Sequence, residues 1–286
     1  MPLRRRLEHL REKHGADAVA VSFYDYETRE AFSHEGARYF HAASTIKVAV
    51  LLALYDAVEK RRFRIEDLLH VRNRFLSVAP EGGIYRVGAE RDANGEVHRA
   101  IGNTMRLHAL AEAMITTSSN LATNLLLDLV GVEEAQAALK EWGVKGVKLV
   151  RGVEDEAAHR AGLNNEVTAD GLVALFRLIE DGEAFSKEAA EDMKEILFGQ
   201  QFRSGLPAGL PRDVREQARV AHKTGEISTV AHDAGLVFLP DRKPYAIAVM
   251  TEWTPEAGNG RSALVAALAR AVYDTFVAEH EHAHHA

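Results

Sequence analysis

The sequence of 286 residues contains no cysteine and no long apolar run. The absence of cysteine excludes disulfides, thiolate nucleophiles and cysteine-ligated zinc or iron–sulfur sites. No segment approaches the ~18–20 apolar residues that are needed to cross a bilayer, so we expect no membrane span. Basic residues are not in excess either: 35 Lys and Arg stand against 42 Asp and Glu, which gives a net charge of −7. This balance argues against a nucleic-acid partner held by phosphate contacts.

Both chain ends are polar. The start, MPLRRRLEHLREKHG, has the charged opening of a signal peptide but no apolar run behind it. It predicts an amphipathic helix with Leu3, Leu7 and Leu10 on one face. We expect a cytoplasmic protein if residue 1 is the native start, and a periplasmic or secreted one if a leader was removed. The histidine-rich tail 279–286 is expected to be a solvated end rather than a metal site.

The chain reads as strands, one apolar helix, a long helical block, strands and a closing helix. Alternation predicts a strand at 18–24 that returns at 29–34, and a second hairpin of 229–239 with 244–251. The run TIKVAVLLALYDAVEK (45–60) is apolar on nearly all sides, which is typical of a buried central helix. Helical periodicity continues in the stretches 107–117, 119–129, 132–142, 169–179 and 187–198, and again in the closing helix 261–278.

One segment inside the helical block departs from this pattern. Residues 84–93 and 96–101 alternate around Ala93-Asn94-Gly95, which predicts a β-hairpin. The fold class that we expect is α/β (α+β), an antiparallel sheet flanked by helices and built from both chain ends. We expect residues 1–286 to form a single domain. Its α/β lobe would comprise 1–60 and 213–286, and its mainly helical lobe 61–212.

The first constellation with chemical potential lies at the start of the apolar helix. Ser44 and Lys47 are three residues apart, so they share one helix face and the amine is predicted to reach the hydroxyl. Burial or a nearby cation would lower the pKa of the lysine and make it a proton acceptor. Taken alone, the pair also fits an N-cap serine beside a lysine whose ammonium reaches solvent.

Two further constellations follow in order. Ser118-Ser119-Asn120 stands between two helical stretches and offers two hydroxyls and an amide. Lys223-Thr224-Gly225 precedes the strand near 229, and on an edge strand it offers a cation, a hydroxyl and close backbone approach. Alone, the former fits a helix cap and polar turn, and the latter a turn that enters a strand.

In combination, the order Ser-x-x-Lys, Ser-x-Asn and Lys-Thr-Gly resembles the penicillin-recognising serine hydrolases, and within them the class A β-lactamases. The resemblance extends over nearly the whole chain. The stretch MITTSSNLATNLLLDLVG (114–131) is especially similar to the class A segment, with Asn124 one helical turn after Asn120.

The resemblance implies a role for each matching residue. Ser44 matches the acylated nucleophile, Lys47 its general base or proton relay, and Ser118 the hydroxyl that passes a proton to the leaving nitrogen. Asn120 matches the ligand of the substrate's amide side chain. Lys223 and Thr224 match the pair that recognises its carboxylate, next to Gly225. The backbone N–H groups of Ser44 and Glu226 would form the oxyanion hole.

The sequence also departs from the family's pattern. Ser119 stands where class A enzymes usually have aspartate, so we expect a looser turn that lacks a charge-assisted hydrogen bond. Glu226 stands where a small residue is usual, and it would narrow the cleft or repel an anionic substrate. No arginine follows near 231–233, which leaves Arg151 and Arg261 as candidate partners of the substrate carboxylate.

Deacylation in class A enzymes uses a glutamate in an R-x-E-x-x-L-N loop. The matching stretch here begins Arg151-Gly152-Val153-Glu154 and lacks the following Leu-Asn. Glu154 is therefore the candidate base, with Glu156 or Lys47 as the alternative. The other interpretation of this segment is a solvated acidic loop.

The resemblance thus implies a serine hydrolase, most simply a β-lactamase, that acts on a small acyl substrate without a metal or other cofactor. A D,D-peptidase-like or esterase activity on the same fold remains an alternative. So does a protein that binds β-lactams or peptidoglycan with little turnover. The sequence leaves the oligomeric state and the choice of substrate open.

Overall fold

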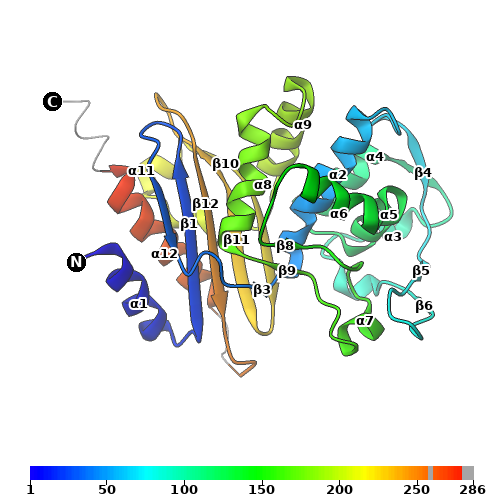
Figure 1. Cartoon of the computed structure of the whole chain (residues 1–286), viewed down its shortest axis with the longest axis horizontal. Helices are drawn as coiled ribbons and strands as arrows, with labels where there is room; N and C mark the ends of the chain where they lie inside the picture. The colour runs from blue at the N-terminus through cyan, green and yellow to red at the C-terminus, as the bar shows by residue number, and fades with distance from the viewer. Residues whose placement is uncertain (257–259, 279–286) are drawn as a thin grey trace.

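A five-stranded antiparallel sheet joins the two ends of the chain (Figure 1). The structure is a computed structural model that describes residues 1–256 and 260–278, so the tail 279–286 lies outside it. The strand order is β10-β11-β12-β1-β2. These strands span Ala18–Asp25 (β1), Ala31–His34 (β2), Arg219–Ile227 (β10), Val230–Phe238 (β11) and Tyr245–Glu252 (β12).

The two hairpins predicted near the chain ends are present, as β1 with β2 and β11 with β12, and the strands of the two ends pair as expected. β1 runs antiparallel to β12 with Ala18 opposite Glu252. The expectation that the strands of the two chain ends share one sheet is thereby confirmed. The sequence placed the Lys-Thr-Gly motif at an edge strand without giving that strand bounds. In the structure the motif lies within β10, an edge strand of nine residues.

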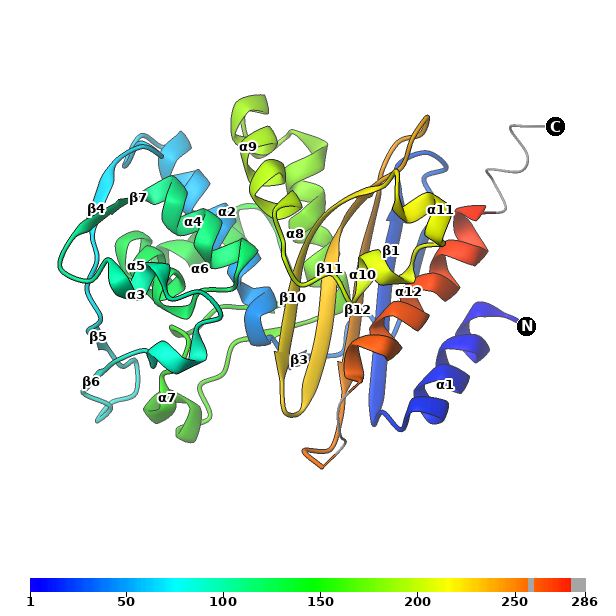
Figure 2. The ribbon, with the colours of Figure 1, turned by 180° about the vertical axis from the view of Figure 1, so that it is seen from behind.

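Helices cover both faces of this sheet (Figures 1 and 2). On one face lie α1 (Leu3–His14), α10 (Leu206–Gly209) and α12 (Arg261–Phe276), with α11 (Arg212–Arg215) close by. On the other face lie α8 (Ala169–Asp181) and α9 (Lys187–Phe198). The strands are apolar on both sides because each face is covered. In β1, Ala18 and Ala20 face α8, whereas Val19, Val21 and Phe23 face α12.

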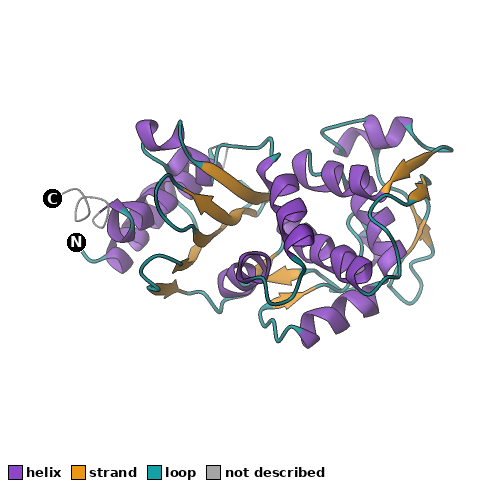
Figure 3. Ribbon diagram, turned by 90° about the horizontal axis from the view of Figure 1, so that it is seen from above, coloured by secondary structure: helices purple, strands orange, loops and turns teal. Residues whose placement is uncertain are grey.

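The remaining helices lie beside the sheet (Figure 3). They are α2 (Lys47–Glu59), which follows the 3₁₀ turn Ala43–Ile46, then α3 (Glu96–Arg99), α4 (Leu107–Thr116), α5 (Asn120–Val130), α6 (Val132–Glu141) and α7 (Glu156–Arg160). Among the residues that the structure describes, three small antiparallel sheets, two of two strands and one of three, accompany these helices. They are β4 (Leu68–His70) with β7 (Thr104–Arg106), β5 (Phe75–Leu76) with β6 (Ile84–Tyr85), and β3 (Phe40–His41) with β9 (Glu166–Val167) and β8 (Val147–Lys148).

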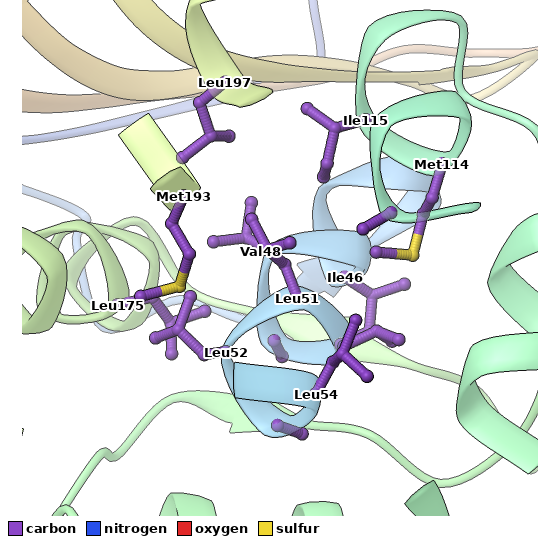
Figure 4. Packing of buried hydrophobic residues seen from close by; sticks show 14 of the residues in the cluster. Ile46, Val48, Leu51, Leu52, Leu54, Met114, Ile115, Leu175, Met193 and Leu197 are labelled. Carbon is purple, nitrogen blue, oxygen red and sulfur yellow. The ribbon is translucent and has the colours of Figure 1, made fainter. Parts of the chain in front are cut away.

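The apolar helix α2 is the centre of the core. Figure 4 shows its side chains enclosed by residues of α4, α8 and α9. Leu51, Leu52 and Leu54 are fully buried, and so is Lys47 at the first position of the helix. The predicted buried central helix is therefore confirmed, and the functional turn before it is anchored to the most enclosed part of the protein.

The predicted hairpin around Asn94-Gly95 is wrong. Residues 96–99 form the short helix α3, and β6 pairs with β5 instead. Gly95 has φ −77°, so the segment does not use the positive φ of a type I′ turn. The Asn94 carboxamide accepts the Glu96 N–H at 2.9 Å, a local hydrogen bond of the kind that starts helices.

No helix within the described ranges combines the length and the apolar character that spanning a bilayer requires.

A buried ion pair links the two chain ends across the sheet. Asp25 ends β1, and both of its carboxylate oxygens accept hydrogen bonds from Arg242 in the β11–β12 turn, at 2.5 and 2.6 Å. The two side chains are 0% and 8% exposed. A charge that is left alone in such a place would be strongly destabilising.

Asp25→Ala should lower the free energy of unfolding by about 3–5 kcal/mol, because it strands the Arg242 charge. Urea denaturation followed by circular dichroism measures this change. The control is Glu66→Ala, which removes the exposed partner of Arg106 and should cost less than about 1 kcal/mol. Equal effects of the two substitutions would contradict the assignment of a structural role to the buried pair.

Candidate active site

Four segments bring the predicted residues to one cleft between the sheet edge and the helices. One pocket of the cleft is lined by Ser44, Ser118, Asn120, Thr224, Gly225 and Glu226. An adjoining pocket shares Ser44, Asn120 and Glu226 and adds Glu154. Lys47 and Lys223 are fully buried behind these linings. The segments are the turn before α2, the α4–α5 turn, the loop before α7 and strand β10.

Ser44 lies in the 3₁₀ turn that leads into α2. The residue before it, Ala43, has a positive φ of 45°, and its N–H donates to His41 Nδ1 at 3.0 Å. This left-handed residue turns the chain sharply at the mouth of the cleft, a strained conformation that the surrounding structure must hold.

Strand β10 touches this turn backbone to backbone. A Cβ on Gly225 would lie 3.0 Å from Ser44 N and 2.9 Å from Thr45 N, so any side chain there would force the two segments apart. The glycine of the third motif is thus required by the close approach that the sequence suggested.

Lys47 directs its ammonium group to the α4–α5 turn. Nζ donates to Ser118 O at 2.8 Å, to Ser118 Oγ at 3.0 Å and to Asn120 Oδ1 at 2.7 Å. The direct hydrogen bond to Ser44 that the spacing predicted is absent from the described part of the chain. The pKa of Lys47 is well below its usual value, first because of burial and then because of the Lys223 charge.

Ser118 lies between two lysines. It adopts a left-handed conformation with φ 59°, and its Oγ accepts from Lys47 and, at 3.2 Å, from Lys223. Lys223 also donates to Thr224 O at 2.9 Å, and burial lowers its pKa to about 7 against the opposing effect of Asp233. Because a hydroxyl has two lone pairs and one proton, the Ser118 proton is left to donate into the cleft.

Asn120 bridges the two halves of the site. Its Oδ1 accepts from Lys47, and its Nδ2 donates to Glu154 Oε1 at 2.6 Å. The other Glu154 oxygen accepts the Gly88 N–H at 3.0 Å, and the side chain is 10% exposed. Glu154 therefore lies inside the site and not in a solvated acidic loop.

The loop that carries Glu154 is held by side chains from elsewhere. Asn124 accepts the Val153 N–H at 2.8 Å and donates to Val153 O at 2.9 Å. The Arg151 guanidinium makes its hydrogen bonds within the loop: it donates to Leu163 O at 2.7 Å and to Gly152 O at 2.9 Å. The prediction that Arg151 binds the substrate carboxylate was wrong, because its guanidinium donates to backbone carbonyls of its own loop.

The side of the cleft beyond β10 also differs from the expectation. Arg261 faces Glu226 at 3.6 Å, so the charge of Glu226 is partly balanced rather than free to repel a substrate. His232 lines the cleft but is neutral at ordinary pH, since burial lowers its pKa to about 4. Its two ring nitrogens bond to His41 O and Thr251 N. Lys223, next to Thr224 in β10, is a fully buried lysine.

The expectation of a loose turn at Ser119 was wrong. The hydroxyl of Ser119 donates to the carboxylate of Asp92 at 2.9 Å, and the N–H of Asn120 donates to the same group at 2.7 Å. Sequence reasoning missed Asp92 because it lies 27 residues earlier, in a segment that was assigned to a hairpin. The local sequence around Asp92 offers no signal beyond an aspartate near a turn, which is common in turns of any function.

Within residues 1–256 and 260–278, no group of three or more His, Cys, Asp or Glu side chains has a metal-binding arrangement.

The sequence is similar to known β-lactamases over most of its length. The profile of the Beta-lactamase enzyme family matches residues 2–276. A β-lactamase of Bacteroides uniformis is 23% identical over 248 residues, which cover 82% of this chain and 79% of that protein. The β-lactamase ROB-1 of Haemophilus influenzae is 25% identical over 260 residues, which cover 90% and 79%.

Solved structures of similar fold were also found. A mutant of PBP-A, described as its acyl-enzyme complex with penicillin G, has a TM-score of 0.79 and 26% identity, covering 96% of both chains. A β-lactamase from Sphaerobacter thermophilus has a TM-score of 0.76 and 26% identity over 95% of both chains. An ancestral class A β-lactamase, at 24% identity and a TM-score of 0.81, covers 96% of this chain and 100% of its own and shares the fold.

The low pKa of Lys223 predicts a specific pH dependence of stability. The folded lysine loses its proton near pH 7, whereas an unfolded lysine keeps it to about pH 10.4. Between these values the unfolded state binds more protons, so the free energy of unfolding should rise with pH. The free energy of unfolding of the unmodified protein, minus that of Lys223→Met, should rise by up to about 1.4 kcal/mol per pH unit in this range. Urea denaturation at pH 7, 8 and 9 measures it, and a difference that stays constant would contradict the burial-lowered pKa.

Proposed function

The chain belongs to the Beta-lactamase enzyme family, and from that membership we propose that it hydrolyses β-lactams through an acyl-enzyme on Ser44. It is a serine hydrolase of the class A type. The observation that carries the assignment of roles is the buried Lys47 with its depressed pKa, placed one turn after Ser44 and against Ser118. A lysine in that state can accept a proton at neutral pH, which an exposed lysine cannot.

Acylation begins when Ser44 Oγ attacks the lactam carbonyl carbon. Its proton passes to the neutral amine of Lys47, which is free to turn one lone pair towards Ser44 when deprotonated. The oxyanion is stabilised by the N–H groups of Ser44 and Glu226, which the contact at Gly225 holds close together. The C–N bond then breaks, and the nitrogen takes the proton of Ser118 Oγ.

The protons return through the same groups. Ser118 is reprotonated by Lys47 or Lys223, both within hydrogen-bond distance of its Oγ. Once Lys47 has taken the Ser44 proton, its ammonium group and that of Lys223 stabilise the negative charge that develops on Ser118 as it gives up its proton. The substrate carboxylate is bound by Lys223 and Thr224, and its amide side chain by Asn120.

Deacylation requires a water that is deprotonated as it attacks the ester on Ser44. Glu154 supplies a carboxylate in the pocket that Ser44 also lines, next to Asn120. It takes one proton of the water as the water oxygen bonds to the ester carbon, and it returns that proton to Ser44 Oγ when the ester C–O bond breaks and the carboxylic acid product forms. The hydrogen bond from Gly88 N–H holds this carboxylate at the rim.

A second candidate function is a penicillin-binding enzyme that acylates and then stalls. The similarity to PBP-A, whose mutant is described as an acyl-enzyme complex with penicillin G, favours considering it. Both candidates share every acylation step. They differ only in whether the Glu154 water reaction is fast.

A labelled penicillin tests the proposed function. The protein should form a covalent adduct that decays as product appears, and Ser44→Ala should form none, as mass spectrometry would show. Ser204→Ala, which removes another hydroxyl of the same pocket, should still form the adduct. A persistent adduct would favour the stalled enzyme, and an adduct that remains on Ser44→Ala would refute the nucleophile.

Glu154→Gln should accumulate the acyl-enzyme, because deacylation loses its base while acylation retains Lys47. A loss of about 10²–10⁴-fold in the deacylation rate is expected for a positioned acid–base group. Stopped-flow kinetics with mass spectrometry resolves the two steps. The matched control is Glu156→Gln, an exposed neighbour of like charge, which should keep normal deacylation. Unchanged turnover in Glu154→Gln would move the base role to Glu156 or Lys47.

A further inference from the structure

Asp92 is a buried carboxylate that the mechanism above does not use. It follows the 3₁₀ turn Ala89–Arg91, and its side chain is 0% exposed. Oδ1 accepts the Asn120 N–H at 2.7 Å, and Oδ2 accepts the Ser119 hydroxyl at 2.9 Å and the Leu121 N–H at 3.4 Å. A buried charge persists only where such donors surround it. These donors form the first turn of α5, where a carboxylate is also favoured by the helix dipole.

The turn that Asp92 holds carries the acceptors of the catalytic lysine. Ser118 is a non-glycine residue with φ 59°, a strained conformation that needs outside support. Its carbonyl and hydroxyl, together with Asn120 Oδ1, receive all three Lys47 hydrogen bonds. A displacement of the turn would therefore move every partner of Lys47 together.

We infer that Asp92 is a positioning residue for acylation, supplying from a distant loop the carboxylate that the Ser118-Ser119-Asn120 motif lacks. This inference rests on the proposed function for its kinetic part. Ser119 completes the arrangement, because its hydroxyl donates to Asp92 and also accepts the Ala122 N–H at 3.2 Å. The Ser119 hydroxyl and the Asp92 carboxylate thus form a hydrogen-bonded pair at the start of α5.

Asp92 also acts on Lys47 through its charge. It raises the pKa of Lys47, as Glu154 does, against the larger lowering by burial and by Lys223. The other titratable group beside Asp92 is His98 of α3, whose Nε2 lies 3.2 Å from Oδ2. Without the Asp92 charge, Lys47 should lose its proton at a lower pH, so the acidic limb of the acylation profile should move to lower pH.

The test compares Asp92→Asn with the charge swap Asp92→Ser/Ser119→Asp. Asp92→Asn should slow the acylation rate constant by about 10–100-fold, the size expected for a displacement of about 1 Å, with a smaller change in KM. The acidic limb should shift as described. The swap returns the carboxylate to position 119 and should recover most of the rate. Glu90→Gln, which removes an exposed charge of the same loop, should match the unmodified protein.

A substrate-free measurement separates this inference from the proposed function. The titration of Lys47, followed by NMR of labelled lysine side chains, should move to lower pH in Asp92→Asn and return in the swap. A wild-type protein that forms no penicillin adduct would refute the proposed function but leave this titration readable. An Asp92→Asn protein with unchanged Lys47 titration and acylation would overturn the inference. So would a folded swap variant that recovers neither.

Discussion

A buried lysine side chain at the start of α2 sets the arrangement of the whole site. Lys47 begins a helix that the protein encloses on all sides, and burying its side-chain nitrogen costs free energy unless oxygen atoms replace the water around it. All three of those oxygens come from the α4–α5 turn. The turn must therefore cross the head of α2, and in doing so it places Ser118 and Asn120 beside Ser44. The position of the proton-transfer groups follows from satisfying the hydrogen bonds of one buried lysine nitrogen.

The sheet supplies the opposite wall because its order leaves β10 at an edge. β10 pairs with β11 and β11 with β12, while β1 lies on the other side of β12, so β10 ends one side of the sheet. An edge strand has unpaired backbone groups that an extended substrate can use. The backbone contact at Gly225 then fixes the distance between this edge and the head of α2. Lys223, buried in the same strand, adds a second positive charge that lowers the Lys47 pKa.

The elements and the motif residues could be predicted from the sequence because their signals are local. Helical periodicity located α2, α4, α5, α6, α8 and α9 to within a residue or two, and three ordered motifs indicated the family and the cleft. The failures concern partners that come from elsewhere in the chain. Nothing in Ser119 or its neighbours shows that Asp92 faces it, and nothing in Arg151 shows that its guanidinium is directed into its own loop. The Asn94-Gly95 signal failed because that glycine keeps a negative φ.

Three of the seven non-glycine residues with positive φ in the described ranges lie at the site. Ala43, Ser118 and Glu154 are non-glycine residues with φ of 45°, 59° and 60°, and they flank or carry the nucleophile, the proton-relay hydroxyl and the candidate base. Each such residue costs on the order of 1–3 kcal/mol and persists only where packing and hydrogen bonds over-determine it. Here the supports are His41 for Ala43, Asp92 for the Ser118 turn, and Asn124 together with Gly88 for Glu154. Two of these supports, Gly88 and Asp92, flank the same 3₁₀ turn Ala89–Arg91, so one short segment helps to hold both the Ser118 turn and Glu154. A displacement of that segment would therefore disturb the proton-relay hydroxyl and the candidate base together, while Ala43 keeps its separate support from His41.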